Sequence, residues 1–286
     1  GNCMIVYKNI EEAFSFYNID NKYKKTCYEC AEEINNSDKY TEAFNKVYKI
    51  LYYNDFSDIR KLWDIRNINE LFIDNVNPFI TNIMILLGYE FHLYNIKKYN
   101  LDDKQISIHK KRVKECFEND LVNREYEGIR ISQMLWAVYF IRVRIIEVGI
   151  LQYEYSITDD NKQVIKIHIP RGNKLDIFSV RKSIDDSKIE IEKIFKVSNC
   201  EYICNSWLLS NQIHELVDKD TNIYKFQELF NVKDGENCIK DILNFVFEIE
   251  NCDDYSLLPE KTTLQKIVKN QLLKDKQFYL GLGVIK

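Results

Sequence analysis

Two spacings of apolar side chains divide this sequence into two parts. Up to about residue 148, apolar positions recur every three or four residues, most clearly in 23–34, 39–53, 58–63 and 79–99. That period places them on one face of an α-helix. After Gly149, apolar and polar residues alternate, which is the pattern of a strand with one buried face. The sequence therefore predicts a helical part followed by a part that contains a β-sheet.

Local signals at helix ends refine the helical part. Asn9 and Glu12 have the spacing of a capping box. Asp102, or the aspartate after it, is placed to cap a helix that runs to about residue 120. The last helix is expected over 131–148, with Gly149 in the C′ position that often ends a helix.

Two alternating segments, 151–158 and 163–169, open the second part and are separated by a polar turn. Glu154 lies on the polar face of the first segment, and His168 lies with Lys166 on the polar face of the second. We expect the two segments to pair as an antiparallel hairpin.

The length of the turn decides how the hairpin is paired. Both apolar faces can meet one core only if the loop has an odd number of residues, because paired positions share a face. A loop of 160–162 places His168 opposite Glu154, and a loop of 159–161 places it opposite Gln152. With either loop, Glu154 and His168 share one face of the sheet.

The remaining pattern alternates helices and strands. A helix is expected from Asp176, its N-cap, to about residue 195, and Thr262 with Gln265 forms a capping box before another. Strands are expected at 202–209, 242–248 and 278–285, and short helices at 211–217 and 224–230. This order predicts an α+β fold, with a helical N-terminal domain over residues 1–125 and a mixed sheet with helical crossovers over residues 126–286.

Composition narrows the class of protein. The chain of 286 residues is 45% apolar and 29% charged, which is ordinary for a soluble globular protein. Its apolar runs are too short to span a bilayer, and its N-terminus lacks the order of residues of a signal peptide. A cytoplasmic protein without a membrane segment is expected. The net charge of −4 argues against a general nucleic-acid binder.

The eight cysteines are scattered through helical patterns. Cys27 and Cys30 form the one C-x-x-C pair, which has no second pair or nearby histidine to complete a metal site. No arrangement of histidine and asparagine in the sequence supports Cys204 as a nucleophile. We expect reduced, mostly buried thiols and no metal.

One segment carries a charge opposite to that of the chain. Between residues 161 and 182 a single acid, Asp176, faces six basic residues, Lys162, Lys166, Arg171, Lys174, Arg181 and Lys182. Pro170 and Gly172 lie in its middle, between a strand and a helix N-terminus. Free N–H groups at a helix N-terminus, and a glycine that lets a phosphate approach the backbone, make such a loop a candidate anion site.

Several groups of residues then occur in the order found in a known family. They are Gly149-Ile-Leu-Gln-Tyr-Glu154, His168-Ile-Pro170 with Gly172, Cys204-Asn-Ser-Trp-Leu-Leu209, Thr221-Asn-Ile223 with Phe226 and Phe230, and Thr263-Leu-Gln265 with Gly281-x-Gly283. From about residue 76 to its end, the chain resembles a two-domain bacterial acyltransferase family. In that family a helical N-terminal domain precedes a domain like those of the GNAT superfamily of N-acyltransferases.

The resemblance implies that the acyl donor is a pantetheine thioester. In GNAT-like folds two parallel strands separate, and the pantetheine arm of acyl-CoA lies between them. The strand at 163–170 looks like the first of these, so the backbone of Ile167 and Ile169 is expected to bind the arm and the thioester carbonyl. The phosphates are expected at the loop residues Arg171, Gly172, Asn173 and Lys174. Because this loop lacks the usual superfamily spacing, acetyl-CoA or another acyl-CoA is the expected donor and an acyl carrier protein is the alternative.

Acyl transfer to an amine needs a base, a polarised carbonyl and a proton for the leaving thiolate. Glu154 and His168 are the candidate acid–base pair, and the hydroxyl of Ser206 is a candidate to protonate the thiolate or orient water. Gln152 and Asn222 are candidates for binding the acceptor, a small-molecule or peptide amine. Each of these residues could instead have a structural role. Glu154, His168 and Ser206 could form hydrogen bonds within the sheet, and Asn222 could cap a helix.

The sequence thus predicts an acyl-CoA-dependent N-acyltransferase with no metal cofactor. A catalytically silent GNAT-like domain that binds pantetheine or a peptide, as a sensor or adaptor, is the second hypothesis. A helical interaction module with an appended sheet is the third. Binding of CoA without thioester turnover would favour the second hypothesis, and failure to bind CoA would favour the third.

Overall fold

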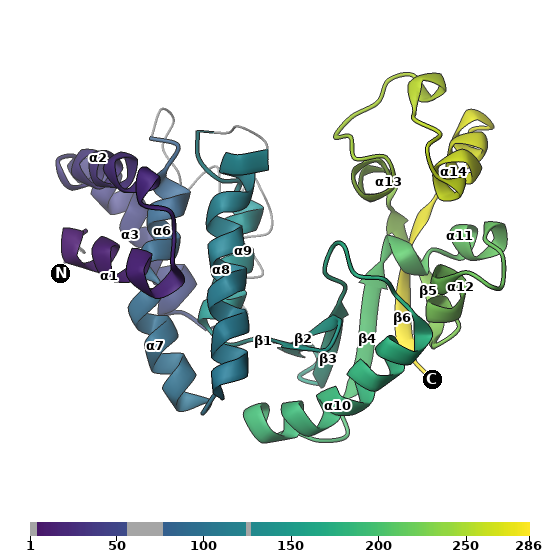
Figure 1. Cartoon of the computed structure of the whole chain (residues 1–286), viewed down its shortest axis with the longest axis horizontal. Helices are drawn as coiled ribbons and strands as arrows, with labels where there is room; N and C mark the ends of the chain where they lie inside the picture. Colours follow the sequence, from purple (N-terminus) through teal and green to yellow (C-terminus); the bar gives the residue numbers. More distant parts are fainter. Residues whose placement is uncertain (1–4, 56–76, 124–126) are drawn as a thin grey trace. The chain divides into compact units, whose positions relative to one another are not determined.

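The computed structural model describes residues 5–55, 77–123 and 127–286. The chain divides into two compact units, Gly1–Ile146 and Glu147–Lys286. The first is helical and the second contains the sheet (Figure 1), so the predicted α+β architecture is confirmed. The helix expected at 58–63 lies outside the described residues. No helix in the three described ranges is long and apolar enough to cross a membrane.

The helical unit is built around a helix that is buried on all sides, as expected for a helix that is apolar all round. In α6 (Ile80–Leu87) every residue is buried. The helices in contact with α6 are α1 (Tyr7–Tyr17), α2 (Lys24–Asn35), α7 (Tyr89–Lys98), α8 (Asp103–Asn123) and α9 (Ile131–Ile141). A further helix, α3 (Asp38–Tyr52), packs on α2.

The core helix predicted over 79–99 is divided at Gly88 into α6 and α7. A Cβ atom at Gly88 would lie 2.5 Å from the hydroxyl oxygen of Tyr52 and 2.8 Å from Cδ1 of Ile141. The Tyr52 hydroxyl in turn donates to the carbonyl oxygen of Met84 at 2.7 Å. Glycine is therefore required here because α3 and α9 approach the backbone so closely.

Of two caps predicted in this unit, one is confirmed. Oδ1 of Asp102 accepts a hydrogen bond from the backbone N–H of Gln105 at 2.8 Å, just at the start of α8. The capping box at Asn9 and Glu12 is wrong, because α1 begins at Tyr7 and both residues lie inside the helix.

α9 packs with the helices rather than with the sheet. The helix predicted over 131–148 ends at Ile141, and Val143, with φ of 52°, turns the chain into a strand. Gly149, with φ of 59°, lies in the turn after that strand instead of at a helix C-terminus. α9 contacts α6, α7 and α8, so the compact helical unit extends past the division expected at residue 125.

The second unit is organised by one six-stranded mixed sheet in the order β1-β2-β3-β4-β6-β5 (Figure 1). β3 and β4 are parallel, whereas β2–β3, β4–β6 and β5–β6 are antiparallel. The strands are β1 (Ile145–Val148), β2 (Leu151–Ile157), β3 (Gln163–His168), β4 (Glu201–Ser206), β5 (Phe230–Asn237) and β6 (Tyr279–Ile285).

One face of this sheet is covered by α10 (Ile177–Phe195), the crossover helix that the parallel pair β3–β4 requires. The hydroxyls of Tyr153 and Ser183 lie 2.7 Å apart, and those of Tyr202 and Ser187 lie 3.0 Å apart. Tyr153 and Tyr202 therefore mark the face of β2, β3 and β4 that packs on α10.

Both caps predicted in the second unit are confirmed. Oδ1 of Asp176 accepts from the N–H of Ser179 at 3.0 Å at the start of α10. Thr262 and Gln265 form a reciprocal capping box at the start of α14 (Thr263–Leu273). The Gln265 amide also donates to the carbonyl oxygen of Val246 at 3.0 Å, which joins α14 to the preceding helix.

The strand predicted at 242–248 is wrong. Those residues lie mostly in α13 (Ile239–Val246), whose buried side chains Ile242, Leu243 and Val246 have helical spacing. The strand predicted at 202–209 ends at Ser206, where the 3₁₀ helix η2 (Trp207–Leu209) begins. The predicted short helices are present as α11 (Asn211–Leu216) and α12 (Asn222–Gln227), and β5 is a strand that the sequence pattern did not predict.

Gly281 on β6 yields a stability prediction. A Cβ atom there would lie 2.2 Å from the carbonyl oxygen of Leu209, a backbone atom of η2 that cannot rotate away. We expect Gly281→Ala to lower the free energy of unfolding by about 2–3 kcal/mol in urea denaturation. Gly235→Ala is the control, because its nearest contact is the end of the Leu282 side chain at 3.0 Å and its nearest backbone contact, the carbonyl oxygen of Leu280, is 3.2 Å away. Equal losses in the two variants would contradict the packing argument.

Candidate active site

The β2–β3 hairpin has the second of the two registers considered, in which His168 lies opposite Gln152. The N–H of Thr158 donates to the carbonyl oxygen of Lys162 at 2.8 Å, which leaves a three-residue loop of 159–161. Gln152 is accordingly the partner of His168. The odd-loop prediction is confirmed, since Glu154 and His168 project from one face, and the paired Tyr153 and Ile167 project from the other.

Glu154 and His168 are in direct contact. Nε2 of His168 lies 3.0 Å from Oε1 of Glu154. The glutamate side chain is 4% exposed and that of the histidine 32%. The other carboxylate oxygen, Oε2 of Glu154, is buried and has no hydrogen-bond partner among the described residues. An unsatisfied buried oxygen of this kind is costly unless a donor from outside the protein supplies the missing bond.

Further polar groups lie beside this pair. Gln152, which is buried, sits opposite His168 on the neighbouring strand. Its Nε2 donates to Oε1 of Glu147 on β1 at 2.9 Å. β1, β2 and β3 thus present Glu147, Gln152, Glu154 and His168 on adjacent strands. The sequence pattern identified all but Glu147, because β1 was mistaken for the end of a helix.

The ladder between β3 and β4 stops beside the pair. In the described sheet its last partners are Lys166 and Ile203, although β3 continues to His168 and β4 to Ser206. The separation of two parallel strands that the family resemblance implies is thus present as a split between β3 and β4, beyond Lys166 and Ile203. Pro170 then follows, and its nitrogen has no hydrogen to donate.

The backbone groups of Ile167 are directed toward this split. In an antiparallel pair, alternate residues send their N–H and C=O groups to opposite neighbours. Thr158 and Lys162 are a hydrogen-bonded pair. Every second pair along the hairpin is of the same kind, so Gln152 and His168 are also a hydrogen-bonded pair. The backbone groups of Ile167, between them, consequently face β4. Ile169 has the same parity at the end of β3.

In the loop after β3, two of the four predicted phosphate-binding residues, Arg171 and Asn173, already contact other parts of the protein. Nη2 of Arg171 donates to Oδ1 of Asn244 at 3.2 Å, and its guanidinium lies 4.6 Å from the ring centroid of Phe245 on α13. Nδ2 of Asn173 donates to the carbonyl oxygen of Ile150 at 3.1 Å. Between them, Gly172 has φ of 86° and open space where a Cβ would lie.

Lys174 completes the loop. It is exposed and forms no ion pair within the described residues. Among the other basic residues of the segment, Lys162 pairs with Glu201 at 3.2 Å and Lys182 with Asp186 at 2.6 Å. The basic segment is thus partly neutralised by local acids, and the uncompensated charge lies on the loop and the first turns of α10.

Ser206 is not brought to Glu154 and His168. Paired residues of parallel strands share a face, so the pairing of Lys166 with Ile203 places residues 202, 204 and 206 on the face that packs on α10. Oγ of Ser206 is also engaged, because it accepts from the N–H of Leu208 at 3.1 Å and caps η2.

Asn222 is likewise separate from the pair. The N-cap of α12 is Thr221, whose Oγ1 accepts from the N–H of Tyr224 at 3.2 Å. Asn222 is the first, exposed residue of that helix, and α12 packs against α10, α11 and η2. Capping therefore belongs to Thr221, and no contact of Asn222 with Glu154 or His168 is present within the described residues.

An aromatic stack at the split was not predicted. The rings of Trp207 and Phe245 are stacked with centroids 6.1 Å apart, and the guanidinium of Arg171 lies over Phe245. Through α13, the loop that follows β3 is thereby connected to the segment that follows β4. Trp207, which lies in one of the family motifs, is the only sequence signal for this stack. Its partner Phe245 could not be identified, because the pattern at 242–248 predicts a strand instead of α13.

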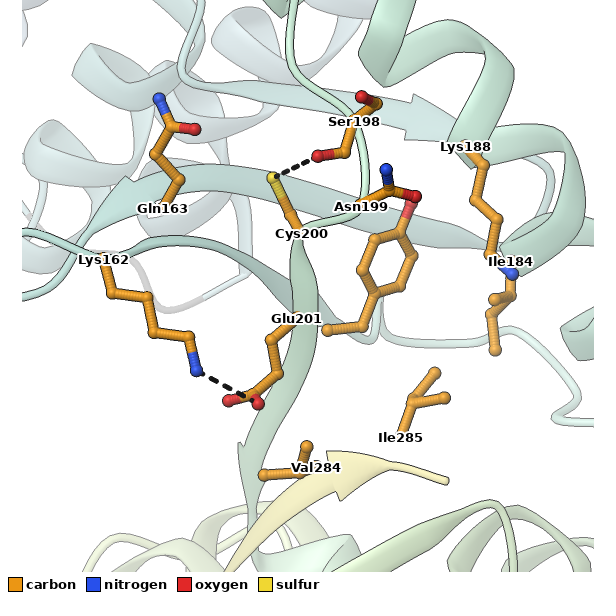
Figure 2. Close-up of a pocket in the computed structure, with 11 residues that line it drawn as sticks. Lys162, Gln163, Ile184, Lys188, Ser198, Asn199, Cys200, Glu201, Val284 and Ile285 are labelled. Carbon is orange, nitrogen blue, oxygen red and sulfur yellow. Dashed lines mark hydrogen bonds and ion pairs between the residues drawn. The ribbon is translucent and has the colours of Figure 1, made fainter.

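A separate cavity of about 560 Å³ lies at the opposite ends of β3 and β4. Lys162, Gln163, Glu201 and Tyr202 line it together with residues of α10 and β6. In Figure 2 the Lys162 side chain points to Glu201, and Cys200 points to Ser198. None of the site residues predicted from the sequence lines this cavity. In the parts of the chain that the structure describes, no group of three or more His, Cys, Asp or Glu side chains could hold a metal ion.

Residues 145–285 match the family described as GNAT-like C-terminal domain. No curated protein gives a significant match to the chain. Among solved structures, an acyltransferase in complex with decanoyl-CoA is 17% identical, with a TM-score of 0.69 over 96% of this chain and 86% of that one. An acyltransferase in complex with decanoyl-CoA and teicoplanin is 16% identical, with a TM-score of 0.71 over 96% and 87%. A mutant acyltransferase in complex with octanoyl-CoA is 16% identical, with a TM-score of 0.72 over 99% and 89%.

The buried thiol of Cys204, on β4 beside the split, allows a test of whether the site uses a cysteine nucleophile. Burial raises the pKa of Cys204 to about 12, so at pH 8 only about one thiol in 10⁴ is ionised. We expect iodoacetamide to leave Cys204 of the native protein unmodified while the less buried Cys252 reacts, as measured by peptide mass spectrometry. Unfolding in guanidinium should make both react. Rapid labelling of native Cys204 would contradict this and support a thiol nucleophile.

Proposed function

We propose that the protein is an N-acyltransferase that moves an acyl group from a pantetheine thioester, such as acyl-CoA, to an amine, because residues 145–285 match the GNAT-like C-terminal domain. The solved structures that share its fold are acyltransferases in complex with decanoyl-CoA or octanoyl-CoA, which supports an acyl-CoA donor. One of them also holds teicoplanin, which supports a peptide-like or small-molecule acceptor.

The observation that carries the proposal is the position of the Glu154–His168 pair. The pair lies on β2 and β3 where the ladder between β3 and β4 has ended. A thioester bound along the split would place its carbonyl near His168. The ladder partners Lys166 and Ile203 engage the N–H of Ile167, so the first N–H on the β4 side of β3 beyond the ladder is that of Ile169. This group would then donate to the carbonyl oxygen, where negative charge grows during attack.

The difference in exposure supports separate roles for the two residues of the pair. His168 is the accessible member, and Glu154 is almost fully buried behind it. On this proposal His168 takes a proton from the attacking amine as the new C–N bond forms, and the Glu154 carboxylate stabilises the resulting imidazolium. The C–S bond then breaks, and the imidazolium returns its proton to the leaving thiolate. Because His168 does both, no role remains for Ser206.

The polar residues around the pair suit an amine acceptor. Gln152 and Glu147 offer carbonyl and carboxylate oxygens, and Oε2 of Glu154 lacks a donor in the described protein. An N–H group of the acceptor would satisfy that oxygen. The phosphates of the donor are proposed to lie at the loop of Arg171, Gly172, Asn173 and Lys174, where the lysine is exposed and the glycine has open space above it.

Glu154→Gln tests the acid–base pair. The amide keeps the shape of the side chain but cannot hold the negative charge that stabilises the imidazolium. We expect turnover on an accepted amine to fall by about 10²-fold or more, with acyl-CoA binding almost unchanged. His168→Ala should have an effect of similar size, and Ser206→Ala a smaller one. Thioester consumption reports turnover, and the acyl-CoA-dependent rise in melting temperature reports binding.

Glu201→Gln is the matched control for this test. Glu201 lies on β4, pairs with Lys162, and is distant from the split at the other end of the strand. It should retain the activity of the unsubstituted protein. Full activity of Glu154→Gln would mean that Glu154 is only a sheet residue. Acyl-CoA binding by the unsubstituted protein, without turnover on a broad panel of amines, would favour the silent sensor or adaptor.

Reversing the charge of the loop tests where the donor phosphates bind. The double variant Arg171→Glu, Lys174→Glu places two carboxylates beside the proposed pyrophosphate. We expect it to weaken CoA binding much more than pantetheine binding, since only CoA carries the pyrophosphate. Isothermal titration with the two ligands gives the comparison. Equal weakening of CoA and pantetheine would show that this loop is not the phosphate site.

A further inference from the structure

The first turns of α10 present an exposed aromatic side chain within a basic surface. Phe178 is 83% exposed, although it lies in the first turn of a helix whose other large apolar residues are mostly buried. Arg181 follows it at a spacing of three residues and so lies beside it on the helix surface. Lys174 lies on the loop that leads into this turn. We call Lys174, Phe178 and Arg181 the α10 patch.

The charge of the α10 patch is not neutralised by the surrounding protein. Lys174 and Arg181 are exposed, and neither forms an ion pair with the described residues. Arg171 next to them has neutral partners, the Asn244 amide and the Phe245 ring. Lys182, by contrast, pairs with Asp186 and adds little. Residues 171–186 hold four basic and three acidic side chains. Of the basic ones, only Lys182 has an acidic partner in the described protein, so the unpaired positive charge favours an acidic partner at this place.

The cap of α10 places a negative charge at the N-terminus of the helix itself. The carboxylate of Asp176 accepts the N–H of Ser179, and hydrogen bonds from the side chain and backbone of Ser179 keep the pKa of Asp176 low. The N–H groups at the start of α10 are thus already served by a carboxylate, and a ligand phosphate is expected at the basic side chains of the loop and the helix surface. The phosphodiester of a pantetheine arm attached to a protein carries a single negative charge.

We propose that the α10 patch docks a small acidic carrier protein that presents the acyl group on a phosphopantetheine arm. The patch adjoins the loop that leads back to the end of β3, so an arm anchored there could enter the split between β3 and β4. Phe178 would supply the apolar centre of the interface, and Lys174 and Arg181 its basic rim. This proposal deepens the function proposed above and rests on it for the acyl transfer itself.

Two variants that avoid the proposed phosphate and catalytic residues test the surface. We expect Arg181→Glu and Phe178→Ala each to weaken binding of a decanoyl-loaded acyl carrier protein by about tenfold or more. Neither should change the affinity for decanoyl-CoA, because neither residue belongs to the proposed phosphate loop or to the Glu154–His168 pair. Fluorescence anisotropy with the labelled carrier protein and titration calorimetry with decanoyl-CoA are the measurements. Raising the salt concentration should weaken carrier-protein binding.

Matched controls lie further along the same helix. Lys188→Glu reverses an exposed charge, and Ile189→Ala truncates an apolar side chain that is 68% exposed. Both should leave carrier-protein binding unchanged. Loss of binding in these controls equal to that in Arg181→Glu and Phe178→Ala would overturn the proposal, because general charge or helix stability would then explain the effect.

The outcomes separate this proposal from the proposed function. If decanoyl-CoA is turned over but the carrier protein does not bind, the docking proposal fails and the acyltransferase stands. If the carrier protein binds through Arg181 but neither donor acylates an amine, the surface stands and the function fails. Binding of the patch to anionic phospholipid vesicles in place of the carrier protein, or loss of a dimer in Phe178→Ala by light scattering, would also overturn it.

Discussion

The parity of one short hairpin loop determines which side chains meet in this protein. Because successive side chains of a strand alternate between the faces of the sheet, the three-residue loop 159–161 puts Glu154 and His168 together. A loop one residue longer or shorter would send one of them into the face that packs on α10. Three features depend on this register: the contact between Glu154 and His168, the burial of the Glu154 oxygen that has no hydrogen-bond partner in the described protein, and the direction of the Ile167 backbone groups. Most of the proposed chemistry is therefore set by the hairpin.

The features predicted best were those whose cause is local. Asp176 and the Thr262–Gln265 pair cap helices through hydrogen bonds within one turn, so a short stretch of sequence contains the whole signal. The Glu154–His168 contact was also predictable, because alternation and loop length are both properties of one hairpin. α10 was expected with nearly its observed ends for the same reason.

The features that were missed depend on contacts between distant segments. Ser206 was placed with the catalytic pair, but the face of β4 is set by its parallel pairing with β3, a register that no neighbouring residue encodes. The segment 242–248 is apolar at both parities, and its helical state follows from packing within a cluster that includes Val268 and Phe278. The pattern predicts β1 as a continuation of α9, since Val143, Ile145, Ile146 and Val148 still have apolar spacing after the run that ends at Ile141, and only the left-handed turn at Val143 separates the two elements.

β5 shows how the sheet ends. It is one of the two edge strands, opposite β1, and beyond Phe230 its side chains are mostly polar or charged, with Lys233, Asp234 and Glu236 around Gly235. Its register with β6 is interrupted between Asp234 and Asn237. Charges and an irregularity on an edge make it a poor template for a further strand from another chain. The sheet is protected at this edge against the growth by strand addition that leads to aggregates, and the same polar sequence that concealed β5 from the hydrophobic pattern provides that protection.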